Sequence, residues 1–327
     1  MLITRTPLRV SFCGGGTDLA AYYREHAQGG AVTSLALARH IYVTVNRRFD
    51  DSVRISYSNM EIVEDFEELK HELVREAMRI TGVTSGVEIT TIADIPSRGT
   101  GLGSSSSVTV GLLHALHTFA GRTPDATQLA EEACSIEIDV LGGTIGKQDQ
   151  YAAAYGGANR ITFHPDDSVI VNPLSFSDDV QAAIRESFCL VYTGQTRQAG
   201  DILVEQAANT EARMDQLTRM RDMADEVATA LEVGNFATVG TLLDEGWQLK
   251  QGMASGITST GIDELYARVR ELGVTGGKLL GAGGGGFILC HTPAGVQQRL
   301  ASELDNRLLP LELSTTGSIV LFDDRGE

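Results

Sequence analysis

A glycine- and serine-rich loop in the first third of the chain has the composition of a phosphate-binding site. It reads IPSRGTGLGSSSS at residues 95–107, where an expected strand ends at Pro96 and an expected apolar helix begins near Ser105. The first N–H groups of a helix have no partners within it, and the helix dipole makes that end partly positive. An anionic phosphate is the expected ligand there. The alternative, a flexible Ser/Gly linker, is disfavoured because the loop is short and leads straight into the helix.

Two further glycine clusters suggest close approach of the backbone to a ligand. Gly14, Gly15 and Gly16 follow an expected strand and precede Thr17 and Asp18, although an ordinary hairpin turn would have the same composition. The segment GGKLLGAGGGGF at 276–287 contains the string GxGxxG, but a strand follows it where a dinucleotide site requires a helix. The spacing of a Walker-type phosphate loop is also absent. These patterns together predict a nucleotide enzyme of another class.

Acidic and basic residues near these loops could catalyse phosphoryl transfer. The reaction requires a metal-holding carboxylate, a cation and a group that orients or deprotonates the nucleophile. Glu137, either Arg9 or Lys147, and Asp149 could supply these groups. Any single acidic residue is more commonly a solvated surface group. Asp149 stands out because it lies in the loop GTIGKQDQ, between two glutamines.

Mixed strands and helices must position these loops. Short apolar runs bounded by turn residues predict strands near both ends of the chain and before the serine loop. Helical spacing of apolar residues predicts helices over 61–82, 105–121, 125–142, 198–252 with a break at Gly234, 261–272 and 292–308. The elements do not alternate regularly as βαβ units, which predicts an α+β fold. The polar stretch 164–185 suggests a hinge, and we therefore expect domains over 1–180 and 181–327.

The overall composition excludes several classes of protein. The chain has 327 residues, with 26 Lys and Arg against 43 Asp and Glu, a formal net charge of −17. Binding to nucleic acid or an anionic membrane requires a basic surface, so neither is an expected partner. The sequence contains no apolar run of about 18 residues, so we expect no membrane span. The four cysteines form no CxxC pair, and the N-terminus lacks a signal sequence, so we expect reduced thiols and a cytoplasmic location.

The glycine clusters, taken in order, resemble the motifs of the GHMP kinases (galactokinase, homoserine kinase, mevalonate kinase and phosphomevalonate kinase). PLRVSFCGGGTD at 7–18 is similar to the family's substrate motif. Residues 95–107 are similar to its ATP-phosphate loop, and KLLGAGGGGFILC at 278–290 is similar to its C-terminal glycine motif. The resemblance covers nearly the full length. It implies a two-domain α+β fold, with an N-terminal ATP-binding domain like that of a ribosomal protein and a ferredoxin-like C-terminal domain.

Within the family, residues 139–157 and 192–203 are most similar to the D-glycero-D-manno-heptose 7-phosphate 1-kinase group. This resemblance implies phosphorylation of the anomeric hydroxyl of a sugar phosphate, with ATP and Mg²⁺ as cofactors and no nucleic-acid or membrane partner. It leaves open a homodimer, a related octose-phosphate kinase and a free-sugar 1-kinase of the fucose or galactose type. A non-catalytic sugar or nucleotide sensor is disfavoured, because Ser105, Glu137 and Asp149 are all present.

The resemblance also implies roles for single residues. Asp149 matches the aspartate that accepts the proton, and Arg9 the basic residue near the transferred phosphate. Ser105 and Glu137 match the Mg²⁺ ligands, and the interval from Glu137 to Asp149 is one residue longer than in mevalonate kinases. The ATP phosphates are expected at Arg98, Gly99, Gly101, Gly103, Ser104, Ser105, Ser106 and Ser107. The substrate is expected at Gly15, Gly16, Thr17, Asp18, Lys147, Thr193, Arg197, Gly283 and Gly284, with Arg197 inferred to bind the sugar's own phosphate.

Overall fold

One long strand organises the larger of two sheets in the computed structural model, which describes residues 1–95, 99–196, 200–304 and 307–325. Strand β2 (Gly30–Arg47) pairs antiparallel with β1 (Leu2–Cys13) along most of its length. Its first residues also pair with β6 (Ala158–Phe163), and its last ones with β5 (Val87–Ala93). The second half of β1 is buried almost throughout, because helices pack against both of its faces. The end of β1 is therefore an interior position from which side chains can reach a site.

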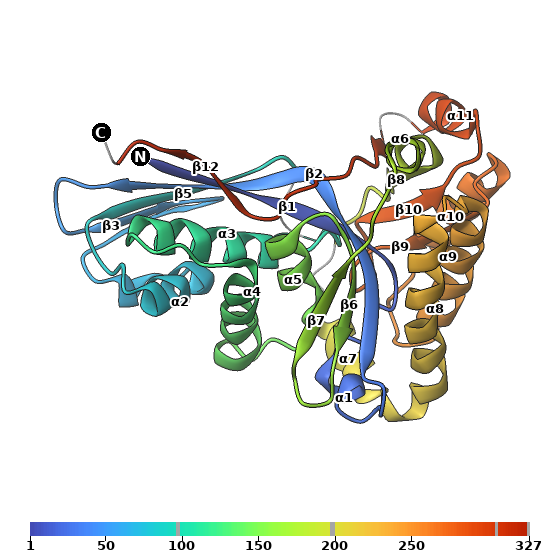
Figure 1. The fold of residues 1–327 in the computed structure, drawn as a ribbon, viewed down its shortest axis with the longest axis horizontal. Coiled ribbons are helices and arrows are strands. Elements are labelled where there is room, and N and C mark those ends of the chain that lie inside the picture. Colours follow the sequence, from blue (N-terminus) through green and yellow to red (C-terminus); the bar gives the residue numbers. More distant parts are fainter. Residues whose placement is uncertain (96–98, 197–199, 305–306, 326–327) are drawn as a thin grey trace.

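The large sheet has the order β12-β1-β2-β5-β3-β4, and β6 and β7 extend it from the first half of β2. Its short outer strands are β3 (Val53–Ser56), β4 (Met60–Val63), β7 (Val169–Pro173) and β12 (Ile319–Asp323). Strand β12 brings the C-terminal segment back beside β1, so that the two chain ends lie close together (Figure 1).

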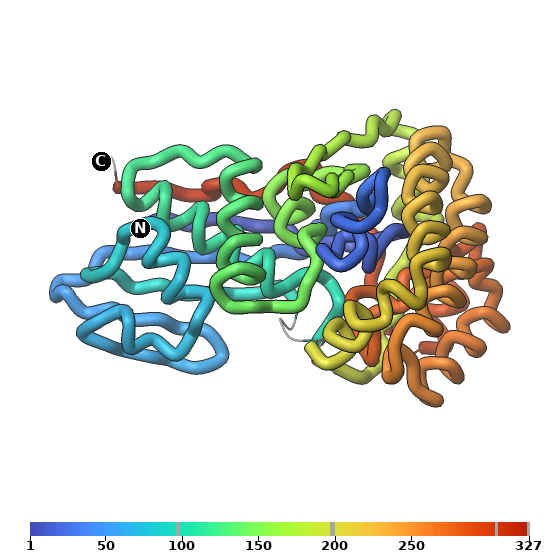
Figure 2. The backbone as a smooth tube through the Cα atoms, turned by 90° about the horizontal axis from the view of Figure 1, so that it is seen from below, coloured from blue at the N-terminus to red at the C-terminus, as the bar shows by residue number. Residues whose placement is uncertain are grey.

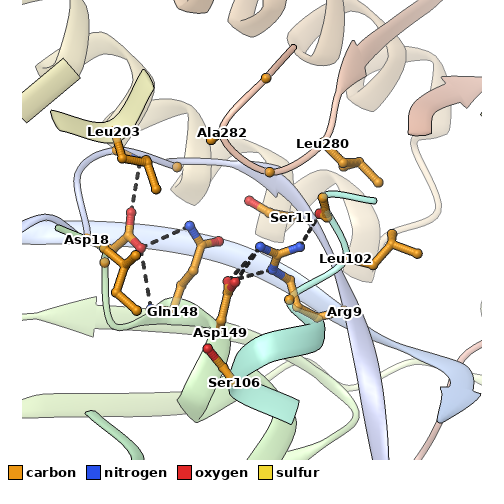
Figure 3. A pocket seen from close by; sticks show the side chains of 18 of the residues that line it. Arg9, Ser11, Asp18, Leu102, Ser106, Gln148, Asp149, Leu203, Leu280 and Ala282 are labelled. Atoms are coloured by element: carbon orange, nitrogen blue, oxygen red, sulfur yellow. Dashed lines mark hydrogen bonds and ion pairs between the residues drawn. The ribbon is translucent and has the colours of Figure 1, made fainter. Parts of the chain in front are cut away.

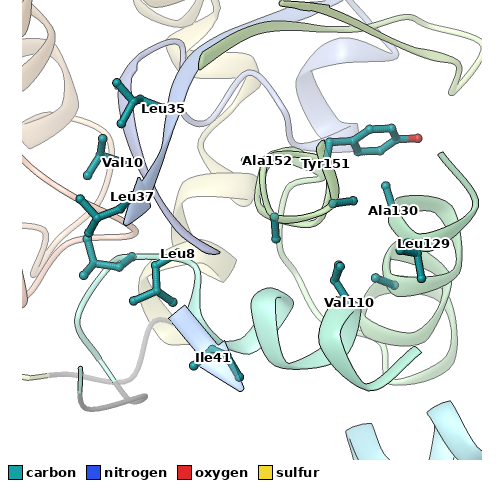
Figure 4. Close-up of a cluster of buried hydrophobic side chains, with 14 of the residues drawn as sticks. Leu8, Val10, Leu35, Leu37, Ile41, Val110, Leu129, Ala130, Tyr151 and Ala152 are labelled. Carbon is teal, nitrogen blue, oxygen red and sulfur yellow. The ribbon is translucent and has the colours of Figure 1, made fainter. Parts of the chain in front are cut away.

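Four helices cover one face of this sheet: α2 (Glu72–Thr81), α3 (Ser104–Phe119), α4 (Ala126–Cys134) and α5 (Gln148–Tyr155). Helix α3 contacts β1, β2, α2, α4 and α5, and most of its residues are buried. Leu8, Leu37 and Ile41 from the sheet lie to the left of Val110 of α3 and Leu129 of α4 in Figure 4, and all five belong to the main hydrophobic core. This packing fixes the N-terminal end of α3, which carries the serines.

A second, four-stranded sheet has the order β11-β8-β10-β9. Helices α8, α9 and α10 gather at this end of the molecule, opposite the end formed by β3 and β4 (Figures 1 and 2). Trp247 of α9 is buried in the core of this part. Its elements are α6 (Asp178–Ser187), β8 (Phe188–Tyr192), α7 (Gly200–Ala208), α8 (Met214–Glu232), α9 (Phe236–Gln251), α10 (Thr260–Glu271), β9 (Gly276–Leu279), β10 (Phe287–His291), α11 (Val296–Glu303) and β11 (Leu308–Pro310).

The mixed arrangement confirms the predicted α+β class, and two local predictions were wrong. The helix expected over 61–82 is confined to α2, because β4 and a 3₁₀ turn occupy its first part. The helix expected from Thr292 begins at Val296, since Gly295 has a φ of 80° and interrupts the turn. The polar stretch after residue 164 contains β7, which forms a hairpin with β6. Within the described parts of the chain, no helix combines the length and apolar character needed to cross a membrane.

Candidate active site

The three glycine clusters meet at one cavity of about 440 Å³. Its walls come from β1 and the turn after it, from the loop before α3, from the segment leading into α5, and from α7, α9 and the loop between β9 and β10. Arg9, Asp18, Gln148 and Asp149 lie close together in it, below Leu280 and Ala282 (Figure 3). Segments as far apart in the sequence as Arg9 and Gly285 therefore share one site.

The loop before α3 can pack closely against the other walls of the cavity because it carries glycines in the left-handed backbone region. Gly103, with a φ of 74°, directly precedes the first turn of α3, and a Cβ there would lie 3.2 Å from both Arg9 and Asp149. A Cβ on Gly101 would lie 2.6 Å from the Leu280 carbonyl oxygen. Ser104, Ser105 and Ser106 of the first helical turn line the cavity. This arrangement directs the free N–H groups of the helix toward a ligand.

Asp149 and Arg9 form a bidentate ion pair in the cavity. The Arg9 Nε and Nη2 atoms donate to the two Asp149 carboxylate oxygens at 2.7 Å each. The third guanidinium nitrogen, Nη1, donates to the Gly101 carbonyl oxygen at 2.5 Å. Arg9 is 4% exposed, so its position is fixed by packing as well as by these bonds. The pair holds the carboxylate in one orientation beside the phosphate loop.

Glu137 and Ser105 place two oxygen atoms side by side. The Ser105 hydroxyl donates to Glu137 Oε1 at 2.6 Å, and the Gln150 amide donates to Oε2 at 2.7 Å. Burial raises the pKa of Glu137, and the negative charge of Asp149 adds to the effect, while hydrogen bonds from neighbours oppose it. Glu137 lies in a π-helical turn (Ser135–Val140) that follows α4. Such a turn accommodates one residue more than an α-turn.

Asp18 is held by the glycine turn and by Gln148. Its Oδ1 accepts from the Gly16 N–H at 2.8 Å, and its Oδ2 accepts from the Gln148 side-chain amide at 2.9 Å. Burial raises the pKa of Asp18, and the charge of Asp149 adds to the effect. The Gln148 Oε1 and Ser11 Oγ atoms are buried without a hydrogen-bond partner among the described residues, and both residues line the cavity. Their unused polar atoms could bind hydroxyl groups.

Most of the predicted site residues surround the cavity. They are Arg9, Gly15, Gly16, Asp18, Gly99, Gly101, Gly103, Ser104, Ser105, Ser106, Glu137, Asp149 and Gly283. Arg98 and Arg197 fall outside the residues that the structure describes.

Five predicted residues do not line the cavity, and each has a structural role nearby. Ser107 donates to the Pro7 carbonyl oxygen and ties α3 to β1, while Thr17 closes its own turn through Gly14 and Ala31. The Lys147 ammonium lies 3.3 Å from Asp167. The remaining two, Thr193 and Gly284, hold the C-terminal glycine loop through the hydrogen bonds Thr193 Oγ1 to Gly286 O and Gly284 N to Ile257 O.

Several cavity residues did not stand out in the sequence. Gln148 had one signal, because it is a polar neighbour of Asp149 in the loop. Lys278 had another, since it lies within the third glycine cluster. Ser11 and Leu203 lie within the stretches 7–18 and 192–203 that carry the family resemblance, whereas Gln206 and Lys250 come from helix positions with no motif around them.

We expect Thr193→Val to destabilise the protein rather than weaken substrate binding. The Thr193 hydroxyl donates to the Gly286 carbonyl oxygen at 3.0 Å and is 8% exposed. Loss of one buried neutral hydrogen bond costs about 1 kcal/mol of unfolding free energy. Urea denaturation measures this cost, with the exposed Thr241→Val as the matched control. A higher substrate KM at unchanged stability would instead support the substrate role predicted from the sequence.

Two models of one protein family match the chain on either side of the cavity. The model of the N-terminal domain of GHMP kinases matches residues 67–157, and the C-terminal model matches residues 227–308. Together the two matches cover more than half of the sequence. The chain belongs to the GHMP kinases. As a member of this kinase family, it is a phosphotransferase.

Individual GHMP kinases resemble the chain over most of its length. The D-glycero-alpha-D-manno-heptose 7-phosphate kinase of Campylobacter jejuni is 29% identical over 302 residues, which cover 87% of each chain. The L-fucokinase/L-fucose-1-P guanylyltransferase of Bacteroides fragilis is 27% identical over 87% of this chain, but the match covers only 34% of that longer protein.

A solved structure confirms the GHMP kinase fold. The crystal structure of a D-glycero-D-manno-heptose 1-phosphate kinase from Bacteroides thetaiotaomicron superposes with a TM-score of 0.82 over 99% of both chains, at 24% identity. The galactokinase of Lactococcus lactis, solved with galactose, gives a TM-score of 0.76 over 98% of this GHMP kinase and 95% of that chain. The two-domain α+β fold predicted from the sequence is therefore correct.

Proposed function

We propose that this GHMP kinase transfers the γ-phosphoryl group of ATP to the anomeric C1 hydroxyl of a sugar phosphate. The proposed substrate is D-glycero-D-manno-heptose 7-phosphate, and the products are the 1,7-bisphosphate and ADP. The observation that carries the proposal is the Arg9–Asp149 pair beside the N-terminus of α3, in one cavity with Asp18. Similarity to the heptose 7-phosphate kinase of Campylobacter jejuni supports the choice of sugar. We take residues 1–180 as the ATP-binding domain and 181–327 as the C-terminal domain.

In this proposal, Asp149 accepts the proton of the C1 hydroxyl as that oxygen attacks the γ-phosphorus. The bond from the γ-phosphorus to the bridging oxygen of ADP breaks, and the bond from C1 oxygen to phosphorus forms. Arg9 orients the Asp149 carboxylate through two hydrogen bonds and places positive charge beside the transferred group. The N–H groups at the start of α3 bind the ATP phosphates. Asp18, Gln148 and Ser11 bind and orient the hydroxyl groups of the sugar.

The donor set at Glu137 and Ser105 fits Mg²⁺. This ion is bound by one or two protein carboxylates together with water and phosphate oxygens, and the two side-chain oxygens are 2.6 Å apart at the cavity wall. Burial raises the pKa of the Glu137 carboxyl group, and a bound cation would lower it again. When bound, Mg²⁺ would neutralise charge on the ATP phosphates.

The proposed function is tested by coupled ADP release from the purified protein with ATP and a panel of sugars. The panel contains heptose 7-phosphate, octose phosphates, the free heptose, L-fucose and D-galactose. Turnover with the heptose phosphate and a new anomeric phosphate in the product NMR spectrum are the expected results. Turnover with an octose phosphate or a free sugar alone would change the assigned substrate. The absence of turnover with any of them would refute the proposal.

We expect Glu137→Gln to raise the Mg²⁺ concentration that gives half-maximal activity by about 10- to 100-fold, the range seen when groups around a metal are altered. The variant keeps the side-chain volume but removes the negative charge. Glu131→Gln is the matched control, because Glu131 is exposed on the preceding helix. An unchanged Mg²⁺ dependence would argue that Glu137 does not hold the ion.

A further inference from the structure

Two buried lysines line the cavity and have no role in the steps described above. The chain contains only four lysines, and two of them, Lys250 on α9 and Lys278 on β9, are 7% and 6% exposed at this site. Lysine side chains are rarely buried to this degree unless a partner compensates their charge. The lysines therefore indicate either a binding site for an anionic ligand or a purely structural role.

No carboxylate pairs with either lysine within the described residues. The Lys250 ammonium donates to the carbonyl oxygens of Leu279, at 3.3 Å, and of Gly281. These two bonds leave one of its three N–H groups for another acceptor. For the Lys278 ammonium, the described part of the chain provides no hydrogen bond or ion pair. Lys278 lines the open cavity, so an acceptor from a ligand can reach it.

The electrostatic environment of the two lysines would favour a bound anion. Burial lowers the pKa of Lys250 well below its usual value, and the charges of Lys278 and Arg9 add to the effect. Burial lowers the pKa of Lys278 to about 8. Arg9 is already neutralised by Asp149, whereas these two ammonium groups are not. A bound anion would stabilise both charged forms.

Lys250 and Lys278 line the same cavity as Asp18 and Gln148, which bind the sugar in our proposal. Asp18 and Arg9 are the site residues whose charges act on both lysines, and neither lysine is among the charges that act on Glu137. The Ser105–Glu137 pair comes from α3 and the π-helical turn, whereas the two lysines come from α9 and β9. A sugar whose C1 hydroxyl faces Asp149 must direct its opposite end to another wall.

We propose that Lys250 and Lys278 bind the phosphate that the substrate already carries, the one that is not transferred. This inference rests on the proposed sugar-phosphate kinase function and deepens it, because it explains why a phosphorylated sugar would be chosen over a free one. Lysine binds phosphate as a compact point charge.

The test compares Lys278→Met with the wild type on heptose 7-phosphate and on the unphosphorylated heptose. Lys278 is chosen because Lys250 also holds the glycine loop. Loss of one hydrogen bond between charged partners predicts a fall of about 10- to 150-fold in kcat/KM for the phosphorylated sugar. The kcat/KM for the free sugar and the KM for ATP should stay near those of the wild type. Lys278→Arg should recover part of the loss, and Lys70→Met, at an exposed lysine, is the matched control.

Three kinetic outcomes for Lys278→Met would overturn the inference. They are equal losses of kcat/KM on both sugars, a rise confined to the KM for ATP, or no change in any of these values. The second of these would assign the lysines to the nucleotide. If the wild type itself turns over neither sugar, the proposed function fails instead, so the two failures are distinguishable.

A labelling experiment on the wild type covers the case in which Lys278→Met does not fold. The pKa of about 8 makes the Lys278 amine partly neutral, and therefore reactive with an acylating reagent, at pH 8. Heptose 7-phosphate should slow its modification, followed by mass spectrometry, while the free heptose should not. Equal modification with and without the sugar phosphate would also overturn the inference.

Discussion

Replacing Asp149 by Asn is expected to lower kcat by about 10²- to 10⁴-fold, the range for loss of a positioned general base. Asparagine has almost the same shape but cannot accept the proton of the sugar hydroxyl. Its amide group would also face the Arg9 guanidinium, which now donates to both carboxylate oxygens at 2.7 Å. The ATP phosphates are expected at the start of α3, so binding of ATP should change little. Steady-state kinetics and calorimetric titration with ATP measure the two effects separately.

The matched control for this variant is Asp139→Asn, because Asp139 is exposed in the neighbouring π-helical turn. A folding check is also required, since Asp149→Asn leaves the buried Arg9 charge without its partner. Denaturation curves establish which fraction of the variant is folded, and kcat is then referred to that fraction. A loss of ATP affinity as large as the loss in kcat would contradict the assignment of Asp149 as the base.

The features predictable from the sequence were those that depend on local backbone chemistry. The break between α8 and α9 lies at Gly234 and Asn235, where the Asn235 side chain caps the new helix. Helix α4 begins after Asp125, whose carboxylate accepts from the Gln128 N–H. The loop before α3 has the left-handed glycines that its composition indicates. In each case, a residue and its close neighbours in the chain determine the conformation.

The features that were missed depend on distant parts of the chain. Lys250 reads as an ordinary polar position near the end of a helix, and only the packing of α9 against β9 buries it at the cavity. The sequence also gives no sign that Lys147, predicted at the substrate, pairs with Asp167 in the β6–β7 hairpin. Thr193 likewise supports a loop almost 100 residues away. Such roles follow from tertiary contacts that single-sequence patterns do not encode.

Gly286→Ala should have the second large effect, because this residue joins the two halves of the site. Its φ is 96°, and a Cβ would lie 2.2 Å from the Thr100 carbonyl oxygen in the phosphate loop. The Gly286 N–H donates to the Gln195 carbonyl oxygen, and its own carbonyl accepts from Thr193, so the strand cannot easily move away. The phosphate loop must therefore shift, and a displacement of about 1 Å at a reacting centre can cost about 10²-fold in rate. We expect a loss of that size in kcat/KM, measured by coupled ADP release.

Gly121→Ala separates this steric effect from backbone strain. Gly121 also has a positive φ, of 78°, but a Cβ there would meet no atom within 4 Å. In the control variant, the free energy of unfolding should fall by only about 1–2 kcal/mol, the cost of a left-handed backbone for alanine. Its kcat/KM should stay unchanged. Gly286→Ala should lose more stability and most of its activity. Equal effects of the two substitutions would mean that the contact between the glycine loops does not position the ATP phosphates. A difference would show that the C-terminal glycine cluster acts through backbone contact with the phosphate loop, and that the site requires both layers of the fold.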